Sequence, residues 1–523
     1  MGFQNPINLK KCSIKKTYMK RRKFIKLSGF TTAGLFVGSS IPFFSSCSNN
    51  DMNMGNMNMG DNMNMGNMNM GQPVAVTEGN FSTFLAIPPI VAGTTTLTAQ
   101  NVTANINGFG NVNGLGYSAN ALLGPTIKVN SGQSMNINFA NQLNEKTNIH
   151  WHGLKIPANM DGHPENSINA GGSFNYNFTV NQRAGLYWYH PHAEGTTAKQ
   201  VFQGLAGLII VNDSEETALN LPSGNRELPL VIQDKRISSG NISYNSTMMD
   251  QMTGLMGQYV LVNGVYAPIH NVETAKYRVR ILNGSNARIY NLALSNGASF
   301  TVIGNDGGLL ATPQSINSLI IAPGERADLI IDFGTMAQNS ELFLISKTFI
   351  GGNAQGKHEF KIMKFKVTTQ VVDNFNIPTT LSAISQLTES IATKTRNFEI
   401  SNMDNGSMSG TMMHTINNKV YDANRIDELV NNGAVEIWTF DNTNGQEPHP
   451  MHLHGLQFQI LKRIGGRGTL AALEKGWKDM ALCMPGEKIK VIIPFNGYLG
   501  KFVFHCHNLE HEETGMMGQF QVL

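Results

Sequence analysis

The C-terminal end of the chain concentrates ligand chemistry in one short run. His505, Cys506, His507, His511 and Met516 lie within twelve residues. One soft thiolate, imidazole nitrogens and a weak thioether are the ligands of an electron-transfer copper site. A structural zinc site fits this run less well, because such a site closes with four Cys or His ligands and does not use a methionine. The run therefore predicts a redox copper site.

The residues before this run predict a β-strand. Residues 500–504 are apolar and aromatic after a glycine and a lysine, and side chains on a strand alternate between its two faces. His505 and His507 should therefore point away from the face that carries Cys506. We expect this strand end to serve two metal sites. Cys506 would belong to the site that accepts an electron from the donor, and the flanking imidazoles to the site to which that electron is then passed.

Three further segments each carry a His-x-His pair. The pairs are His150 with His152, His190 with His192, and His452 with His454, and His449 precedes the last pair. Residues i and i+2 of a strand share a face and can close on one metal centre. Ten of the fourteen histidines lie in these four segments, a clustering that random scatter would not produce.

Together these segments resemble the four copper-binding motifs of the multicopper oxidases, the family of laccases, bilirubin oxidases and cuprous oxidases. The resemblance extends over the mature chain and implies four copper ions, one of type 1, one of type 2 and two of type 3. It assigns the type 1 copper to His449, Cys506, His511 and Met516. It assigns the type 2 copper to His150 and His452. The type 3 ions would be held by two sets, His152, His190 and His507 on one ion, and His192, His454 and His505 on the other.

The resemblance also implies the reaction. Donors would give single electrons to the type 1 copper, and the three-copper cluster would reduce O2 to water with four electrons and four protons. Proton supply calls for carboxylates near that cluster. Asp161 and Glu512 match acidic positions that relay protons in the family, while taken alone each is equally consistent with a solvated or turn carboxylate.

Short β-branched apolar runs, separated by turn residues, predict an all-β protein. The resemblance implies three cupredoxin-like Greek-key β-barrel domains, which we expect at residues 73–213, 226–370 and 396–523. The first and the last domain carry two motifs each, so the three-copper cluster is expected between them. The middle domain carries none, and its expected role is architectural.

The N-terminal residues predict export. Residues 1–46 contain Lys20-Arg21-Arg22-Lys23 before an apolar stretch and resemble a twin-arginine signal. Cys47 follows as in a lipoprotein processing site, or as an incidental cysteine after an ordinary cleavage site. We expect an exported monomer, periplasmic or membrane-anchored as a lipoprotein. Removal of nine Lys and Arg residues changes the formal charge from +3 to −6, so nucleic-acid binding has no support. Only Cys483 then remains besides Cys47 and Cys506, which excludes a disulfide framework.

Methionines form three groups. Residues 47–72 repeat Met-Asn-Met-Gly four times and are expected to be a flexible tether. Thioethers favour Cu(I), which indicates copper capture. The alternative is a plain spacer, which would need only Gly and Asn. A second group lies in the last domain, near His414. The candidates for Cu(I) capture are Met52, Met54, Met57, Met59, Met63, Met65, Met68, Met70, Met403, Met408, Met412 and Met413. A third group, Met248, Met249, Met252 and Met256, has helical spacing and is expected to pack in a core or on a surface helix.

The remaining histidines, His163, His270, His358 and His414, are expected to be structural, with His414 the one candidate for an extra ligand. The leading function is an oxidase of Cu(I), of phenolic or other small aromatic donors, or of both, with O2 as acceptor and a role in copper tolerance. One alternative is a general laccase. Another, from a different class, is a copper-sequestering tolerance protein, against which the complete set of ligands argues.

Overall fold

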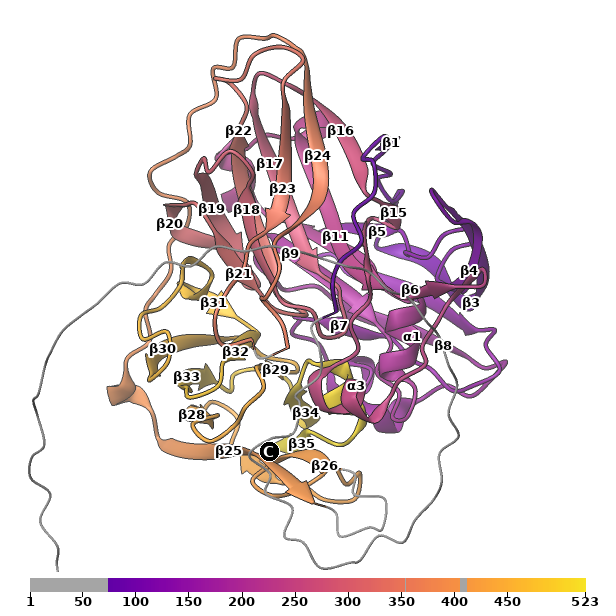
Figure 1. The fold of residues 1–523 in the computed structure, drawn as a ribbon. Helices are drawn as coiled ribbons and strands as arrows, with labels where there is room; N and C mark the ends of the chain where they lie inside the picture. Colours follow the sequence, from indigo (N-terminus) through magenta and orange to yellow (C-terminus); the bar gives the residue numbers. More distant parts are fainter. Residues whose placement is uncertain (1–73, 353, 405–411) are drawn as a thin grey trace, which may run out of the picture. The chain divides into compact units, whose positions relative to one another are not determined.

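The computed structural model describes residues 74–352, 354–404 and 412–523. The expected export signal, Cys47, the tether and its eight methionines lie outside the described residues, as do Met408 and the side chains of Met403 and Met412. The described residues fold into three units of two packed sheets each, which we call the first, middle and last domain (Figure 1). The predicted all-β class is confirmed.

The first domain encloses a core of apolar side chains between a five-stranded and a six-stranded sheet. On β6 (Ser134–Asn141), Met135, Ile137 and Phe139 are buried while intervening residues are less so, the alternation of a strand with one face on a core. The five-stranded sheet runs in the order β2 (Ile90–Ala92), β5 (Thr126–Asn130), β10 (Gly207–Asn212), β9 (Gly185–His190), β7 (His150–His152). The other runs β12 (Ile237–Ser238), β13 (Asn241–Ile242), β4 (Gly110–Gly116), β3 (Thr94–Ile106), β6 (Ser134–Asn141), β8 (Ser173–Thr179).

The middle domain has the largest apolar core of the three and carries no His-x-His pair. Its six-stranded sheet runs β1 (Thr83–Phe84), β16 (Pro268–Glu273), β24 (Phe360–Thr369), β23 (Glu341–Ser346), β18 (Tyr290–Leu294), β21 (Leu319–Ile321). Its seven-stranded sheet runs β15 (Val265–Tyr266), β14 (Tyr259–Val262), β11 (Glu227–Lys235), β17 (Lys276–Asn283), β22 (Arg326–Asp332), β19 (Phe300–Asn305), β20 (Gly308–Ile316).

The last domain carries the C-terminal run at the end of a strand in its five-stranded sheet. That sheet runs β27 (Glu428–Val430), β35 (Met517–Val522), β34 (Gly500–Cys506), β29 (His449–Leu453), β32 (Met480–Cys483). Its six-stranded sheet runs β26 (Met412–Ile416), β25 (Lys394–Asp404), β28 (Val435–Asp441), β33 (Lys488–Pro494), β30 (Phe458–Ile464), β31 (Trp477–Lys478). Residues 500–506 form the predicted strand.

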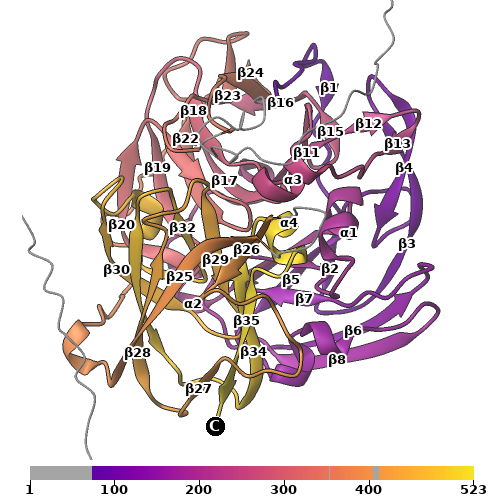
Figure 2. The same ribbon diagram turned by 60° about the horizontal axis from the view of Figure 1, so that its bottom comes forward.

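Two short segments cross between the domains. β1, early in the chain, pairs with β16 of the middle domain, and β13 pairs with β4 of the first domain. An apolar cluster around Trp188 and Leu282 also joins the first two domains. Both views place β7 of the first domain beside β29 of the last (Figures 1 and 2). The strands that carry the His-x-His pairs therefore lie close together between the first and the last domain.

The helices are short and lie in the connections. They are α1 (Thr197–Gln203), α2 (Ser214–Ala218), α3 (Met248–Thr253) and α4 (Leu509–Glu513), with single 3-10 turns η2 (Ala158–Met160), η3 (Pro164–Asn166), η4 (Gly224–Arg226), η5 (Glu389–Ile391) and η6 (Ala472–Glu474). No helix in the described part of the chain has the length and apolar character needed to cross a bilayer.

Candidate metal centres

A thiol and two imidazoles meet at the end of β34. Sγ of Cys506 lies 3.5 Å from Nδ1 of His449 and 3.7 Å from Nδ1 of His511, and the two Nδ1 atoms are 3.3 Å apart. His449 comes from β29, beside β34, and His511 from α4, which follows β34 directly. The backbone of Met516, whose side chain is fully buried, is hydrogen-bonded to both Cys506 and His511. The structure thus brings together all four residues expected at the type 1 copper.

Burial shapes the chemistry of this first cluster. It raises the pKa of the Cys506 thiol and lowers the pKa of both imidazoles well below the usual value. The imidazoles are therefore neutral and can offer lone pairs, while the thiol loses its proton only when a cation replaces it. The backbone N–H of Asn508 points at Sγ from 3.4 Å and would stabilise the thiolate.

The outer side of the first cluster is covered by α3 and β26. Nε2 of His511 lies 2.8 Å from the backbone oxygen of Met252 on α3, so His511 donates there. His414 from β26 also donates to this oxygen through Nε2, at 2.9 Å, and its ring centroid lies 3.7 Å from that of His511. His414 is buried, and its Nδ1 has no hydrogen-bond partner. Of the four remaining histidines, only His414 lies at a cluster.

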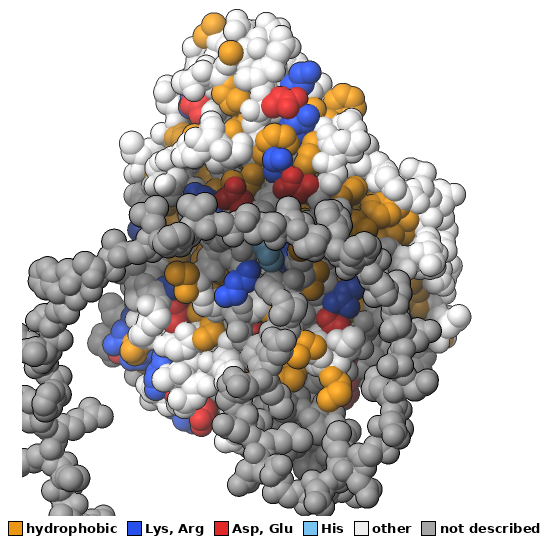
Figure 3. Space-filling view, in the orientation of Figure 1, with side chains coloured by type: hydrophobic (Ala, Val, Ile, Leu, Met, Phe, Trp, Pro, Cys, Tyr) orange, Lys and Arg blue, Asp and Glu red, His pale blue; other side chains and the backbone are white. Residues whose placement is uncertain are grey.

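Eight other imidazoles form a second cluster between the first and the last domain. Their facing nitrogens are 3.1–3.4 Å apart in four pairs, namely His150 with His452, His192 with His505, His454 with His505, and His152 with His190. Four of the eight rings come from β7, β9 and the residues directly after β9, and four from β29, β34 and the residues directly after them. All eight are buried, and histidine is nearly absent from the visible face of the molecule in Figure 3.

The second cluster fits a group of metal ions. Burial, followed by repulsion from neighbouring histidines, lowers the pKa of six imidazoles well below the usual value: His152, His190, His192, His452, His454 and His507. Neutral imidazole is the form that binds metal. Both ring nitrogens of His507 and Nδ1 of His192 are buried without a hydrogen-bond partner, a cost that coordination would remove. Sets within metal-binding reach include His192, His454 and His505.

Three carboxylates contact the outer nitrogens of this cluster. Oδ2 of Asp161 lies 2.7 Å from Nδ1 of His454, and Oε2 of Glu512 lies 3.1 Å from Nδ1 of His505. These are the two carboxylates that the sequence predicted near the cluster. The third, Asp479, accepts a hydrogen bond from Nε2 of His152 at 3.1 Å. Sequence reasoning missed Asp479, because no local pattern surrounds it.

The methionine groups have different outcomes. Met256 is buried in a small apolar cluster, as expected for packing, but Met248 and Met249 on α3 are 57% and 37% exposed. Met413, half-buried on β26, lines a pocket of about 200 Å³ together with His192 and Glu512. This pocket therefore leads from the surface to the second cluster.

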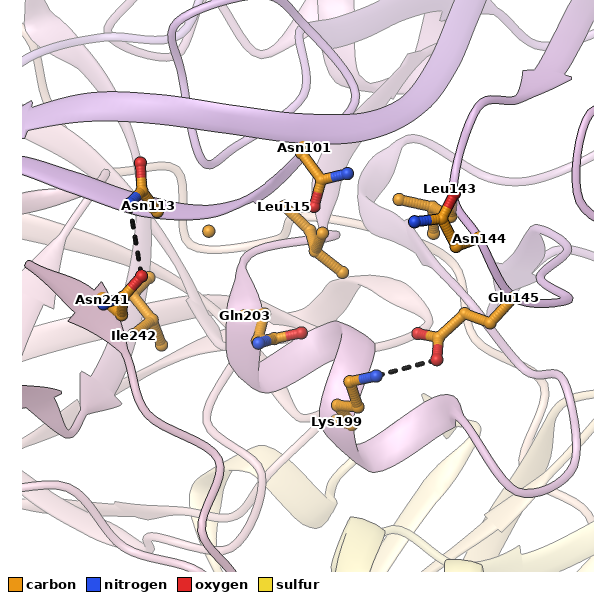
Figure 4. Close-up of a pocket in the computed structure, with 11 residues that line it drawn as sticks. Asn101, Asn113, Leu115, Leu143, Asn144, Glu145, Lys199, Gln203, Asn241 and Ile242 are labelled. Atoms are coloured by element: carbon orange, nitrogen blue, oxygen red, sulfur yellow. Dashed lines mark hydrogen bonds and ion pairs between the residues drawn. The ribbon is translucent and has the colours of Figure 1, made fainter.

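The other remaining histidines lie apart from both clusters. His163 accepts a hydrogen bond from the backbone of Glu165 and caps η3; His270 is half-buried on β16, and His358 is exposed. A pocket of about 300 Å³ beside β3, β4 and α1 has an amide-rich lining, and Lys199 pairs with Glu145 there at 2.7 Å (Figure 4). No motif histidine lines this pocket.

Two such clusters, joined by three consecutive residues of one strand end, are what an oxidase with several copper centres requires. Multicopper oxidase family models match residues 98–216, 231–367 and 392–523. The multicopper oxidase mco of Staphylococcus epidermidis is 36% identical over 421 residues, which is 80% of this chain and 85% of that protein. The laccase of Bacillus subtilis is 32% identical over 453 residues, 75% of this chain and 87% of that protein.

A solved structure gives the same result. The McoA multicopper oxidase of the hyperthermophile Aquifex aeolicus matches with a TM-score of 0.77 at 35% identity and covers 85% of this chain and 99% of its own. The chain belongs to the multicopper oxidase family. It is a copper-containing oxidoreductase that passes electrons from reducing substrates to O2, and the predicted cupredoxin-like fold is confirmed.

Proposed function

We propose that this protein oxidises Cu(I), with small phenolic donors as secondary substrates, and holds four copper ions. Met516, His449, Cys506 and His511 would bind the type 1 copper, and His150 and His452 the type 2 copper. The type 3 ions would be bound by two sets, His152, His190 and His507, and His192, His454 and His505. Bound copper supplies one-electron transfer at the first cluster and four-electron reduction of O2 to water at the second.

The observation that carries this proposal is the position of Cys506 between His505 and His507. The thiol belongs to the first cluster, while both flanking imidazoles belong to the second. An electron accepted by a metal held at Cys506 would therefore have a path of a few covalent bonds into the second cluster.

The carboxylates support a role in proton supply. Glu512 contacts His505, lies 3.6 Å from Nε2 of His192, and lines the pocket of about 200 Å³ that also contains Glu194 and Glu513. This pocket gives water a route to Glu512. Asp161 has one oxygen on His454 and one without a hydrogen-bond partner, so it can hold a proton next to the cluster.

The cover over His511 supports Cu(I) as the preferred donor. His511 is fully buried, and its outer nitrogen bonds to the backbone of α3. A bulky aromatic ring therefore cannot touch the imidazole, whereas a small cation can approach Met248 and Met249, which are exposed on the covering helix α3. The candidates for Cu(I) capture in residues 52–70 and in residues 403–413 would concentrate that cation, in support of copper tolerance.

Oxygen consumption by the copper-loaded protein would test the donor. Cu(I) should be oxidised faster than a phenol, and deletion of residues 52–71 should slow Cu(I) oxidation without affecting phenol oxidation. Faster phenol oxidation that the deletion leaves unchanged would indicate the alternative, a general laccase. Copper binding without oxygen consumption would indicate a sequestering protein.

Export through the twin-arginine route, a lipid on Cys47 and a monomeric state complete the proposal. Replacement of Arg21 and Arg22 by lysine, which should block export, would test the first. The mass of the mature N-terminus would test the second, because a lipidated chain would begin at Cys47 with an added acyl mass. Light scattering would test the third.

A further inference from the structure

Asp479 sets the tautomer of an imidazole in the second cluster. Its Oδ1 lies 3.1 Å from Nε2 of His152, and both residues are fully buried. A carboxylate only accepts hydrogen bonds, so His152 must carry its proton on Nε2. The lone pair of His152 then lies on Nδ1, the atom that is 3.4 Å from Nε2 of His190 inside the cluster.

Asp479 is in turn held by an arginine of the middle domain. Nη1 and Nη2 of Arg326 donate to the two carboxylate oxygens of Asp479 at 2.7 and 2.6 Å. This two-pronged contact fixes the plane of the carboxylate as well as its position. Arg326 is the first residue of β22 and is fully buried.

Every N–H donor of the Arg326 guanidinium has a partner. Nε donates to the backbone oxygen of Leu186 at 3.0 Å, Nη1 also donates to that of Gly324 at 3.0 Å, and Nη2 also donates to that of Asp306 at 2.9 Å. A guanidinium has five such donors, so Arg326 has no freedom to turn. Leu186 lies on β9, the strand that ends at His190. One side chain of the middle domain therefore contacts both domains that carry the histidines.

We propose that Arg326 and Asp479 are positioning residues for the type 3 copper ligand His152, an inference that rests on the proposed function. The middle domain, expected to be architectural, would then take part in holding the cluster. Residues that orient a metal ligand from behind commonly affect metal retention by roughly 10- to 100-fold. The residues just before Arg326 also pack against a second expected ligand, His507. A Cβ added at Gly324 would lie 3.2 Å from three ring atoms of His507.

A buried ion pair on the same strand provides a matched control. Arg278 pairs with Asp328 of β22, with Nη2 and Oδ2 also 2.6 Å apart, and both side chains are buried. The ion-pair partners recorded for Arg278 in the described part of the chain are Asp328 and Glu216, neither of which contacts a histidine. Loss of either arginine removes a short buried ion pair, although Asp328 keeps a longer one with Arg280 at 3.8 Å. Only Arg326→Gln also frees His152.

The test compares wild type, Arg326→Gln and Arg278→Gln as full-length, copper-loaded proteins. We would measure copper per chain, the fraction of copper visible by electron paramagnetic resonance, the blue absorption of the type 1 site, and the thermal unfolding of the copper-free forms. Two type 3 copper ions that are magnetically coupled give no paramagnetic signal. In Arg326→Gln we expect copper to be lost or to become paramagnetic at the type 3 pair, while the blue absorption remains. Arg278→Gln should unfold at a lower temperature but keep the coupled type 3 pair.

Equal copper content and coupling in the two variants would overturn the inference. A wild-type protein without a coupled pair would overturn the proposed function itself, so the two failures are distinguishable. Arg326→Lys keeps the charge but replaces five fixed donors with three on a flexible stem, so it should fold even where the Gln variant does not. We expect Arg326→Lys to lose part of the coupling, and full coupling in it would refute the positioning role.

Discussion

Replacement of Gly324 by alanine should damage the cluster through a single methyl group. Gly324 has φ of +82° and packs against the His507 ring, where an added Cβ would lie 3.2 Å from ring atoms. Carbon contacts are optimal at about 3.5–4.0 Å, so the ring or the loop must move by a few tenths of an ångström. The left-handed backbone costs an alanine about 1–2 kcal/mol, and overpacking adds about 1–3 kcal/mol.

Comparison with Gly433 separates the overpacking cost from the backbone cost. It also has φ of +82°, but a Cβ added there would have no atom within 4 Å. Gly433→Ala should therefore suffer only the backbone cost. The difference of about 1–3 kcal/mol between the variants should give Gly324→Ala the lower melting temperature of the two.

Two measurements would check this prediction. Thermal unfolding of the copper-free variants gives the packing cost, and the absorption of the coupled copper pair in the loaded variants reports on His507. We expect Gly433→Ala to match wild type in copper content and Gly324→Ala to lose copper at the type 3 pair. Identical melting temperatures and copper contents for the two variants would show that the Gly324 contact does not shape the site.

Three further changes test separate parts of the molecule. Glu512→Gln keeps the shape of the side chain but cannot carry a proton, so turnover with O2 should fall roughly 10²- to 10⁴-fold. Anaerobic bleaching of the blue type 1 site by the donor should stay unchanged. Equal loss of both rates would contradict a role of Glu512 in proton supply. His414→Ala removes the ring whose centroid lies 3.7 Å from that of His511 and should raise phenol oxidation several-fold relative to Cu(I) oxidation; an unchanged ratio would refute the argument that this ring shields His511. Burial lowers the pKa of Lys235 to about 7, so the folded state binds fewer protons than the unfolded state between about pH 7 and 10.5, and stability should rise with pH there by roughly 1.4 kcal/mol per unit. Lys235→Met should abolish that rise, as measured by denaturant unfolding at several pH values.

Sequence alone predicted the residues that converge on the two clusters because their spacing follows strand geometry. His505 and His507 flank Cys506 at the end of β34, and the alternation of side chains sends them to a different cluster from the thiol. Where the periodicity of a strand determines the direction of a side chain, a local motif is sufficient.

The residues that orient these side chains had no such signal. His152 and Asp479 are 327 residues apart, and Arg326 lies 153 residues from Asp479. The acceptor for His511 is a backbone carbonyl, that of Met252, and any residue type would provide it. These contacts arise only from the packing of the three domains. For the same reason, the exposure of Met248 and Met249 did not follow from their helical spacing, since the length and docking of α3 decide it.

The carboxylates divide the assembly of the second cluster between domains. Asp161 of the first domain bonds to His454 of the last, whereas Asp479 of the last domain bonds to His152 of the first. Each domain therefore supplies imidazoles whose proton positions are set by the other. A separated domain would keep its strands but not the ring orientation that neutral ligands need. Docking of the domains and formation of the copper cluster must consequently be coupled. Arg326 of the middle domain bonds to Leu186 of the first domain and to Asp479 of the last. The domain without a His-x-His motif therefore also takes part in this coupling.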